Sequence, residues 1–114
     1  MAFSKSDLCA SLKWVKPASE EEKGTFRLRF FKKGAEGIAI DPGHPVAVKL
    51  WMPSMGHGSS PVKVAPLKSS TGSTLPGEYE VSEVYFVMPG AWEIWVQLKQ
   101  GSKVLDQAKI EIKL

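Results

Sequence analysis

The stretch WEIWVQL at residues 92–98 alternates apolar and polar positions with a period of two. Successive side chains of a β-strand point to opposite faces of its sheet, so this alternation predicts a strand with one apolar face. The apolar face would hold Trp92, Ile94, Val96 and Leu98. A strand of this kind covers a core on one side and meets solvent on the other, as in antiparallel sheets.

On both sides of residues 92–98 the same alternation recurs along the chain, and helical periodicity is almost absent. The apolar faces of these further strands run over Leu8 to Trp14, Phe26 to Phe30, Val46 to Met52, Val62 to Val64, Tyr79 to Val81 and Ala108 to Leu114. Short strands with turn signals at intervals of about 8–12 residues are typical of a sandwich. We therefore expect an all-β, immunoglobulin-like β-sandwich of about seven strands.

The length fits a single domain over residues 1–114, in which residues 1–7 would be a flexible N-terminus or the remnant of an expression start. Residues 17–23, which include Glu20, are expected as a charged loop, and residues 68–76 as a flexible loop. Pro66 should end the short strand before it. The apolar phase shifts between residues 81 and 84, which predicts a β-bulge or a break near Ser82-Glu83.

The overall composition is that of a globular protein: 43% of the 114 residues are hydrophobic, 24% are charged, and the net charge is +3. Lysines are interleaved with carboxylates, so the sequence shows no continuous basic patch of the kind that binds nucleic acid. No apolar run approaches the roughly 20 residues of a membrane span, and no signal peptide is visible. Cys9 is the single cysteine, so an internal disulfide is excluded. It could be a free thiol, form a disulfide with another chain or simply fill space.

The stretch MPSMGHG at residues 52–58 is the most informative motif. Met52, Met55 and His57 place two thioether sulfurs and one imidazole within six residues, in a segment whose proline and glycines are not expected in a regular strand or helix. Soft thioether and imidazole ligands suit copper, and Cu(I) above all. Each residue also has a plain alternative. Met52 could be core, Met55 could cap the end of the sandwich, and His57 could be a solvated loop residue.

Two more residues bear on this motif. Met88 ends an apolar stretch just as Met52 does, so both could meet at one pole of the sandwich, or Met88 could fill the core. His44 begins the strand that Met52 ends, and a straight strand at about 3.3 Å per residue separates the two by roughly 26 Å. One metal ion would not reach both, so His44 is a surface residue or belongs to a separate site.

Four tryptophans are many for a chain of this size. Trp14 and Trp92 are in phase with core residues and are expected to be structural. Trp51 and Trp95 are out of phase, and as exposed aromatics they could anchor a partner, stack near a cation or pack beneath a loop. We take Trp51 and Trp95 as candidate partner-binding residues.

Catalytic motifs are absent from the sequence, which contains no GxSxG, HExxH, CxxC or Gly-rich phosphate loop. The glutamates at residues 20–22 form a run of solvated charge rather than an acid–base pair. We therefore expect that the protein is not an enzyme.

Two motifs give the chain a family resemblance. They are WMPSMGHG at residues 51–58 and MPGAWEI at residues 88–94, with Gly77-Glu78-Tyr79 and Phe86 between them. In this order and spacing, over roughly residues 24–99, the chain resembles the YtkA-like and FixH-like group of small domains. More distantly, it is similar to copper carriers of the CopC type.

The resemblance implies an immunoglobulin-like domain that works in the periplasm or otherwise outside the cytoplasm, with a leader removed. It also implies that Met52, Met55 and His57 form a metal-facing loop for copper, with Met88 nearby. FixH-like members are linked to the maturation of copper-containing oxidases, so the partner would be a membrane or envelope protein such as a copper oxidase subunit. FixH-like proteins also carry an N-terminal membrane helix, which is not seen in this sequence.

The expected function is therefore an extracytoplasmic copper-binding or copper-delivery domain that uses a Met/His loop, with a link to oxidase assembly. The alternative is a non-metal, immunoglobulin-like interaction module that docks onto an envelope or membrane protein through Trp51 and Trp95. Carbohydrate binding by the same two tryptophans is a third interpretation, and the sequence offers no polar constellation to support it.

Overall fold

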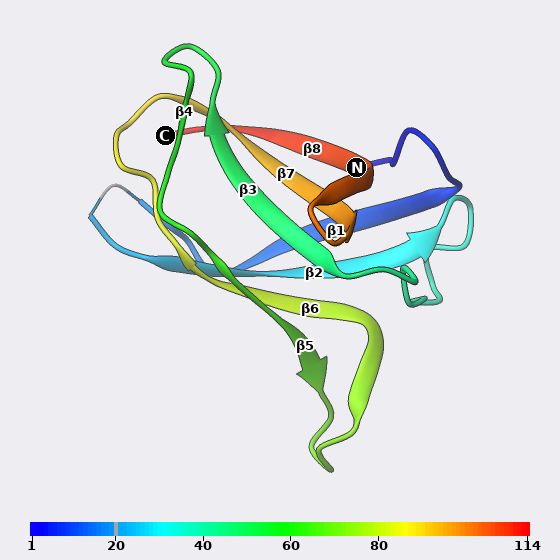
Figure 1. Ribbon diagram of the computed structural model, residues 1–114. Helices are drawn as coiled ribbons and strands as arrows, with labels where there is room; N and C mark the ends of the chain where they lie inside the picture. The colour runs from blue at the N-terminus through cyan, green and yellow to red at the C-terminus, as the bar shows by residue number, and fades with distance from the viewer. Residues whose placement is uncertain (20) are drawn as a thin grey trace.

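The computed structural model describes residues 1–19 and 21–114 and contains two antiparallel sheets of four strands each (Figure 1). The first sheet consists, in spatial order, of β1 (Leu8–Lys16), β2 (Gly24–Lys32), β6 (Thr74–Val84) and β5 (Lys63–Lys68). The second sheet consists of β4 (His57–Gly58), β3 (Val46–Met52), β7 (Ala91–Gln100) and β8 (Lys103–Lys113). The expected all-β class is confirmed. Within the described ranges there is no helix, and so none long and apolar enough to cross a membrane.

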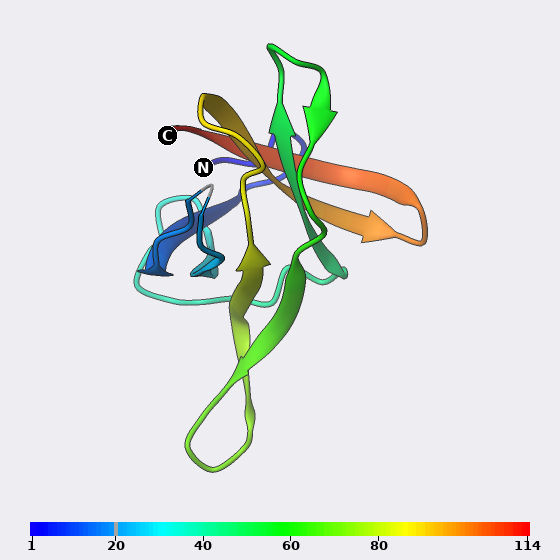
Figure 2. The same cartoon turned by 90° about the vertical axis from the view of Figure 1, so that its left-hand side faces the viewer.

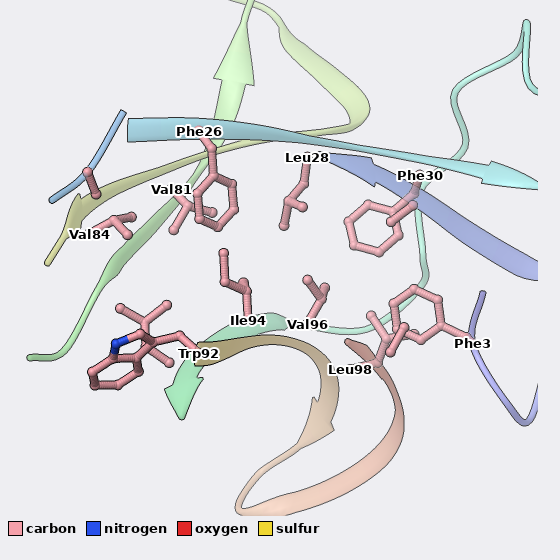
Figure 3. Close-up of a cluster of buried hydrophobic side chains, with 14 of the residues drawn as sticks. Phe3, Phe26, Leu28, Phe30, Val81, Val84, Trp92, Ile94, Val96 and Leu98 are labelled. Atoms are coloured by element: carbon pink, nitrogen blue, oxygen red, sulfur yellow. The ribbon is translucent and has the colours of Figure 1, made fainter. Parts of the chain in front are cut away.

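The core lies between the two sheets, and Figure 3 shows the side chains of β2 facing those of β7. The alternation at residues 92–98 predicted this arrangement correctly. Trp92, Ile94, Val96 and Leu98 are all buried, as are Phe26, Leu28 and Phe30 across from them. Burial of each such side chain contributes about 1.5–3 kcal/mol, so the two alternating strands supply much of the stabilisation of the fold.

The phase shift predicted near Ser82-Glu83 is a β-bulge in β6. Gly24 pairs with Val84, but Phe26 pairs with Val81, so the four residues 81–84 of β6 lie opposite the three residues 24–26 of β2. Glu83 takes up the extra position with φ of 60°, in the left-handed region. The bulge returns Val84 to the core, where it is fully buried.

Two predicted boundaries in this part of the chain are wrong. β5 continues through Pro66 to Lys68, and β6 begins at Thr74, so the connecting turn spans residues 69–73 and not residues 68–76. Proline is tolerated in β5 because this strand is the edge of the first sheet, where the missing N–H costs no ladder hydrogen bond. The paired strands extend the β5–β6 hairpin beyond the body of the sandwich (Figure 2).

The predicted loop between the first two strands is confirmed. Residues 17–19 and 21–23 connect β1 to β2, and Glu20 lies outside the described residues. Residues 101–102 join β7 to β8 in a tight turn. Residues 33–37 leave β2 through turns and lead the chain toward the second sheet.

The N-terminal residues pack against β1, where the sequence predicted a flexible segment over residues 1–7. Ala2 forms a β-bridge with Cys9. Phe3 is buried, and its ring centroid lies 5.9 Å from that of Phe30. Phe3 and backbone hydrogen bonds hold this segment, and a stretch of seven residues is too short to show a periodicity that would predict it.

Candidate functional site

β3 and β4 form a tight hairpin at one end of the sandwich, where the sequence predicted an irregular loop (Figure 1). Residues 53–56 make the turn, and the amides of Met55 and Gly56 donate to the Met52 carbonyl at 3.3 and 2.9 Å. Met52 and His57 are direct cross-strand partners. Directly opposite side chains leave a sheet on the same face, so the thioether and the imidazole point in the same direction.

Met52 is 3% exposed and reaches the loop that follows β6. A Cβ built on Gly90 would lie 2.4 Å from Met52 Cε, so the thioether occupies space that only a glycine leaves open. Met88 precedes this glycine by two residues, is half-buried and packs against the same core. The fold therefore brings Met52 beside the loop that carries Met88. We call this end of the sandwich, formed by residues 52–58 and 85–90, the Met/His end.

His57 is half-buried, and its ring meets the ring of Trp92 edge to face, with centroids 5.8 Å apart. The Nδ1–H of His57 donates to the Gly58 carbonyl at 2.9 Å. Since a carbonyl oxygen only accepts, the neutral imidazole carries its proton on Nδ1 and keeps a lone pair on Nε2. The indole Nε1–H of Trp92 donates in turn to the Met88 carbonyl at 3.0 Å, which joins His57 and Met88 through one ring.

The remaining predicted ligands lie apart from this cluster. Met55 sits in the turn of the β3–β4 hairpin and is 59% exposed. His44 is exposed at the opposite end of β3, as expected, beside a pocket of about 370 Å³. The structure thus brings together Met52, His57 and the Met88 loop, but leaves Met55 outside and His44 at the far end.

Two residues of this cluster were missed as site residues by sequence reasoning. Trp92 was interpreted only as core, yet it is the contact between His57 and the Met88 loop. Gly90 was considered only as part of the MPGAWEI motif, yet it is the position against which Met52 packs. The spacing of Met88, Gly90 and Trp92 within five residues was the available signal, because a turn followed by a strand brings such neighbours to one end of a sheet.

The two candidate partner-binding tryptophans lie half-buried on the outer face of the second sheet. Lys49 Nζ lies 4.5 Å from the ring centroid of Trp51, and Lys109 Nζ lies 5.4 Å from that of Trp95. Glu93 accepts hydrogen bonds from Trp95 Nε1 at 3.1 Å and from Lys109 Nζ at 2.6 Å. The hydrogen bond from Lys109 lowers the pKa of the Glu93 carboxyl and raises the pKa of the Lys109 ammonium. Lys49, Glu93 and Lys109 therefore place polar groups beside the two tryptophans, an arrangement that the sequence alone did not reveal.

Across residues 1–19 and 21–114, no three His, Cys, Asp or Glu side chains gather in a group that could hold a metal ion. Cys9 is a free, half-buried thiol on β1. The chain matches no protein-family model, and comparisons with curated proteins and with solved structures also give no match.

Proposed function

We propose that the chain binds a copper ion at the Met/His end, as a cargo that it holds and passes on. Met52 and His57 would be the principal ligands, with Met88 beside them. The cross-strand pairing of these two residues carries the proposal, because it points one sulfur and one imidazole to the same face of the sheet. Thioether and imidazole donors favour Cu(I) over hard cations.

The hydrogen bonding of His57 supports the same function. A metal-bound histidine usually donates its second ring N–H to a carbonyl or carboxylate, which fixes both the tautomer and the ring orientation. His57 already makes this bond, from Nδ1 to the Gly58 carbonyl. Its Nε2 can then coordinate without a change of tautomer, and Trp92 holds the ring from the side.

Met55 would serve the transfer of the ion to a partner. It lies in the hairpin turn with most of its side chain in solvent, where a partner protein could approach it. A methionine has three flexible side-chain torsions, so the sulfur can exchange between the bound ion and a partner ligand at low cost. The buried Met52 would hold the ion while Met55 hands it on.

We also infer an immunoglobulin-like topology for the sandwich. The orders β1-β2-β6-β5 and β4-β3-β7-β8 correspond to strands A-B-E-D and C′-C-F-G of that fold. This correspondence supports the resemblance to the YtkA-like and FixH-like group. Membership would make the chain a non-catalytic, extracytoplasmic domain that delivers copper to an envelope protein such as an oxidase subunit.

An anaerobic Cu(I) competition titration against a chromophoric chelator tests the proposal. We expect the wild type to bind a single equivalent. Met52→Leu and His57→Gln should each weaken the affinity at least tenfold, the range that loss of a ligand or its support typically produces (~10–100-fold). His44→Gln is the matched control, since it removes the same side chain at the opposite end of β3, and its affinity should equal that of the wild type.

The same titration at lower pH probes the role of His57. An imidazole must be neutral to ligate, so acidification from about pH 7.5 to about pH 5.5 should weaken binding by the wild type and leave His57→Gln unaffected. If the wild type fails to compete with the chelator, the Met/His end is structural. If Met55→Leu is the variant that abolishes affinity and Met52→Leu is not, the ion is held at the hairpin tip.

A second candidate function rests on the outer face of the second sheet, where Trp51 and Trp95 lie half-buried beneath lysine ammonium groups. Aromatic side chains dominate the energetics of protein interfaces, so this face could dock onto an envelope protein. In a pull-down from a membrane-protein extract, capture that is lost in Trp51→Ala but kept in Met55→Ala would favour the interaction module over copper delivery.

A further inference from the structure

A row of cations crosses the outer face of the first sheet. Lys13 of β1 lies directly opposite Arg27 of β2, and Ser11 lies directly opposite Arg29. These positions alternate with the buried residues of both strands, so their side chains point away from the core. Two like charges placed directly opposite each other destabilise a pair of strands. The Lys13–Arg27 pair therefore weakens the sheet unless an anion lies between them.

Within residues 1–19 and 21–114, no carboxylate forms an ion pair with these cations. Among the residues that the structure describes, Lys13 and Arg27 make no side-chain ion pair or hydrogen bond. Glu80 of β6 is the cross-strand neighbour of Arg27 on its other side, but the two form no ion pair. Arg29 donates to the backbone carbonyl of Glu36 and forms no ion pair with Glu78, its cross-strand neighbour on β6.

The sheet is hollowed at this place. A pocket of about 240 Å³ is lined by Ser11, Lys13, Arg27, Leu28, Arg29, Leu67 and Glu78. Leu67 belongs to the edge strand β5, so the protruding β5–β6 hairpin supplies one wall (Figure 2). Three cations against one carboxylate give the pocket a net positive charge, and its volume is below the ~300 Å³ at which pockets for drug-sized ligands begin.

Two lysines on the outer face of the second sheet are arranged differently. There, Lys49 lies over the ring of Trp51, and Lys109 contacts both Glu93 and the ring of Trp95. Each of these lysines has a partner on its own face. In the first sheet, by contrast, Lys13 and Arg27 face each other directly. The carboxylates opposite Arg27 and Arg29 on β6, those of Glu80 and Glu78, form no ion pair with them.

We propose that this pocket binds a small molecule that carries a phosphoryl or carboxylate group. Lys13, Arg27 and the hydroxyl of Ser11 can all donate hydrogen bonds, and an oxyanion offers only acceptors, so the two sets are complementary. The fork of a guanidinium matches two oxygens of such a group, and charge-assisted hydrogen bonds are about twice as strong as neutral ones. An anion between Lys13 and Arg27 also removes their mutual repulsion.

Glu78 narrows the class of ligand further. It lines the same pocket as the cations and lies directly opposite Arg29 on β6. A carboxylate only accepts hydrogen bonds, so it would repel a bare polyanion and select a ligand with a hydroxyl or ammonium group next to its oxyanion. A phosphorylated polyol or a similar small phosphate ester has both features. The pocket lies on the first sheet, so this ligand is independent of copper binding.

Titration of the ¹⁵N-labelled protein with glycerol 3-phosphate, followed by NMR, tests the proposal. We expect saturable shifts of the backbone amides of residues 11–13 and 27–29. Arg27→Gln should weaken binding by about tenfold or more, because it removes a charge-assisted hydrogen bond. Lys103→Gln is the matched control, since it removes one positive charge from an exposed position on the second sheet, and it should bind as the wild type does. The absence of saturable shifts, or equal weakening by both variants, would overturn the proposal.

Thermal unfolding adds a readout that a purely structural arginine would not give. Without ligand, Arg27→Gln should melt at about the same temperature as the wild type, because it relieves the repulsion from Lys13 but also removes the attraction to Glu80. Glycerol 3-phosphate should raise the melting temperature of the wild type and leave that of Arg27→Gln unchanged. A ligand-free variant that melts lower than the wild type would assign Arg27 to holding the sheet and contradict the proposal.

The phosphate ester has two possible sources, a soluble molecule and a lipid headgroup. Vesicles of phosphatidylcholine with phosphatidylglycerol, against vesicles of phosphatidylcholine alone, separate the two in a flotation assay. Flotation that requires the phosphatidylglycerol and Arg27 would identify a headgroup, whereas NMR binding of glycerol 3-phosphate without flotation would identify a soluble ligand. Failure of both assays would show that the pocket binds neither.

Discussion

The two ends of the sandwich are closed by opposite kinds of chemistry. At the end that holds the N-terminal segment, Asp106 of β8 is 6% exposed, and the backbone N–H of Lys5 donates a bifurcated hydrogen bond to its two carboxylate oxygens, each at 3.2 Å. The hydroxyls of Ser4 and Ser6 donate to the same carboxylate at 3.3 and 3.0 Å, and the amide of Gln107 donates at 2.9 Å. A buried carboxylate with this many donors ties two distant parts of the chain together.

At the Met/His end, sulfur and aromatic groups close the sandwich. Met52 packs on Gly90, and His57 packs on Trp92. Nε2 of His57 has no hydrogen-bond partner among the described residues. The two ends therefore differ in role. The carboxylate of Asp106 is enclosed by hydrogen-bond donors and ties down the N-terminal segment. Under the proposed function, the sulfur and imidazole at the Met/His end would offer lone pairs to a soft metal ion.

The largest effect on stability is expected at Asp106. Asp106→Ala leaves the donors on Lys5, Ser4 and Ser6 without their acceptor, and we expect a loss of roughly 3 kcal/mol in the free energy of unfolding. Urea denaturation measures this loss. Asp7→Ala is the matched control, because it removes an exposed carboxylate from the same segment and should change stability by no more than about 0.5 kcal/mol.

Measuring the Cu(I) affinity of Asp106→Ala shows whether the effect of this substitution is confined to one end of the sandwich. Asp106→Ala should keep the Cu(I) affinity of the wild type wherever it remains folded, since the Met/His end lies at the far end of β3 and β7. Equal losses of stability in Asp106→Ala and Asp7→Ala would show that the polar cluster does not tie down the N-terminal segment. A loss of copper affinity in folded Asp106→Ala would show that the two ends are coupled.

An intermediate effect is expected at Gly90. Its φ of 139° is strained for any other residue, and an added Cβ would lie 2.4 Å from Met52 Cε. Gly90→Ala should therefore lower stability by about 1–2 kcal/mol and displace the Met52 thioether. A double-mutant cycle separates the two causes, because in a Met52→Ala background the clash disappears and only the backbone strain remains.

The outcome of that cycle decides how closely the Met/His end is packed. If the cost of Gly90→Ala is the same in both backgrounds, Met52 does not press on the loop, and the packing argument for the site fails. A smaller cost in the Met52→Ala background would place Met52 and the Met88 loop in direct contact in solution. The copper titration of Gly90→Ala should then show weaker binding than the wild type.

Much of the fold followed from local pattern. The alternation at residues 92–98 predicted a core strand because a period of two puts every apolar side chain on one face. The bulge at Ser82-Glu83 was predictable for the same reason, since a change of phase within one strand requires an extra residue. These features are encoded in neighbouring residues, and no information from distant strands was needed to find them.

The features that were missed depend on distant contacts. Asp106 lies on the inward face of β8 together with Ala108. An aspartate is expected in solvent unless hydrogen-bond donors surround it. The donors from the N-terminal segment lie about 100 positions earlier in the chain. Pro66 is compatible with a strand only because β5 has no neighbour on one side. The pairing of His57 with Met52 depends on how the turn closes, and Gly and Pro residues predicted only that the chain bends there.

The smallest effect is expected at the exposed carboxylate of Glu83, which stands at the bulge near the Met/His end. Lys23 Nζ lies 2.7 Å from Glu83 Oε2, and the two side chains are 63% and 52% exposed. The hydrogen bond from Lys23, followed by its charge, lowers the pKa of the Glu83 carboxyl below its ordinary value of 4.5. Solvent screens such a pair, so Glu83→Gln should cost far less stability than Asp106→Ala.

The pH dependence of that small difference has a definite sign. Because the folded pKa is lowered, the stability from the Lys23–Glu83 pair is fully present above about 4.5 and is lost as the pH falls through the folded value. Wild type and Glu83→Gln should therefore differ at neutral pH and converge by about pH 3, whereas Glu21→Gln, which removes an unpaired exposed carboxylate, should track the wild type throughout. A difference between wild type and Glu83→Gln that persists in acid would mean that the side chain supports the bulge through packing. In that case the role of Glu83 near the Met/His end would depend on packing, unlike the charge-based role of Asp106 at the other end.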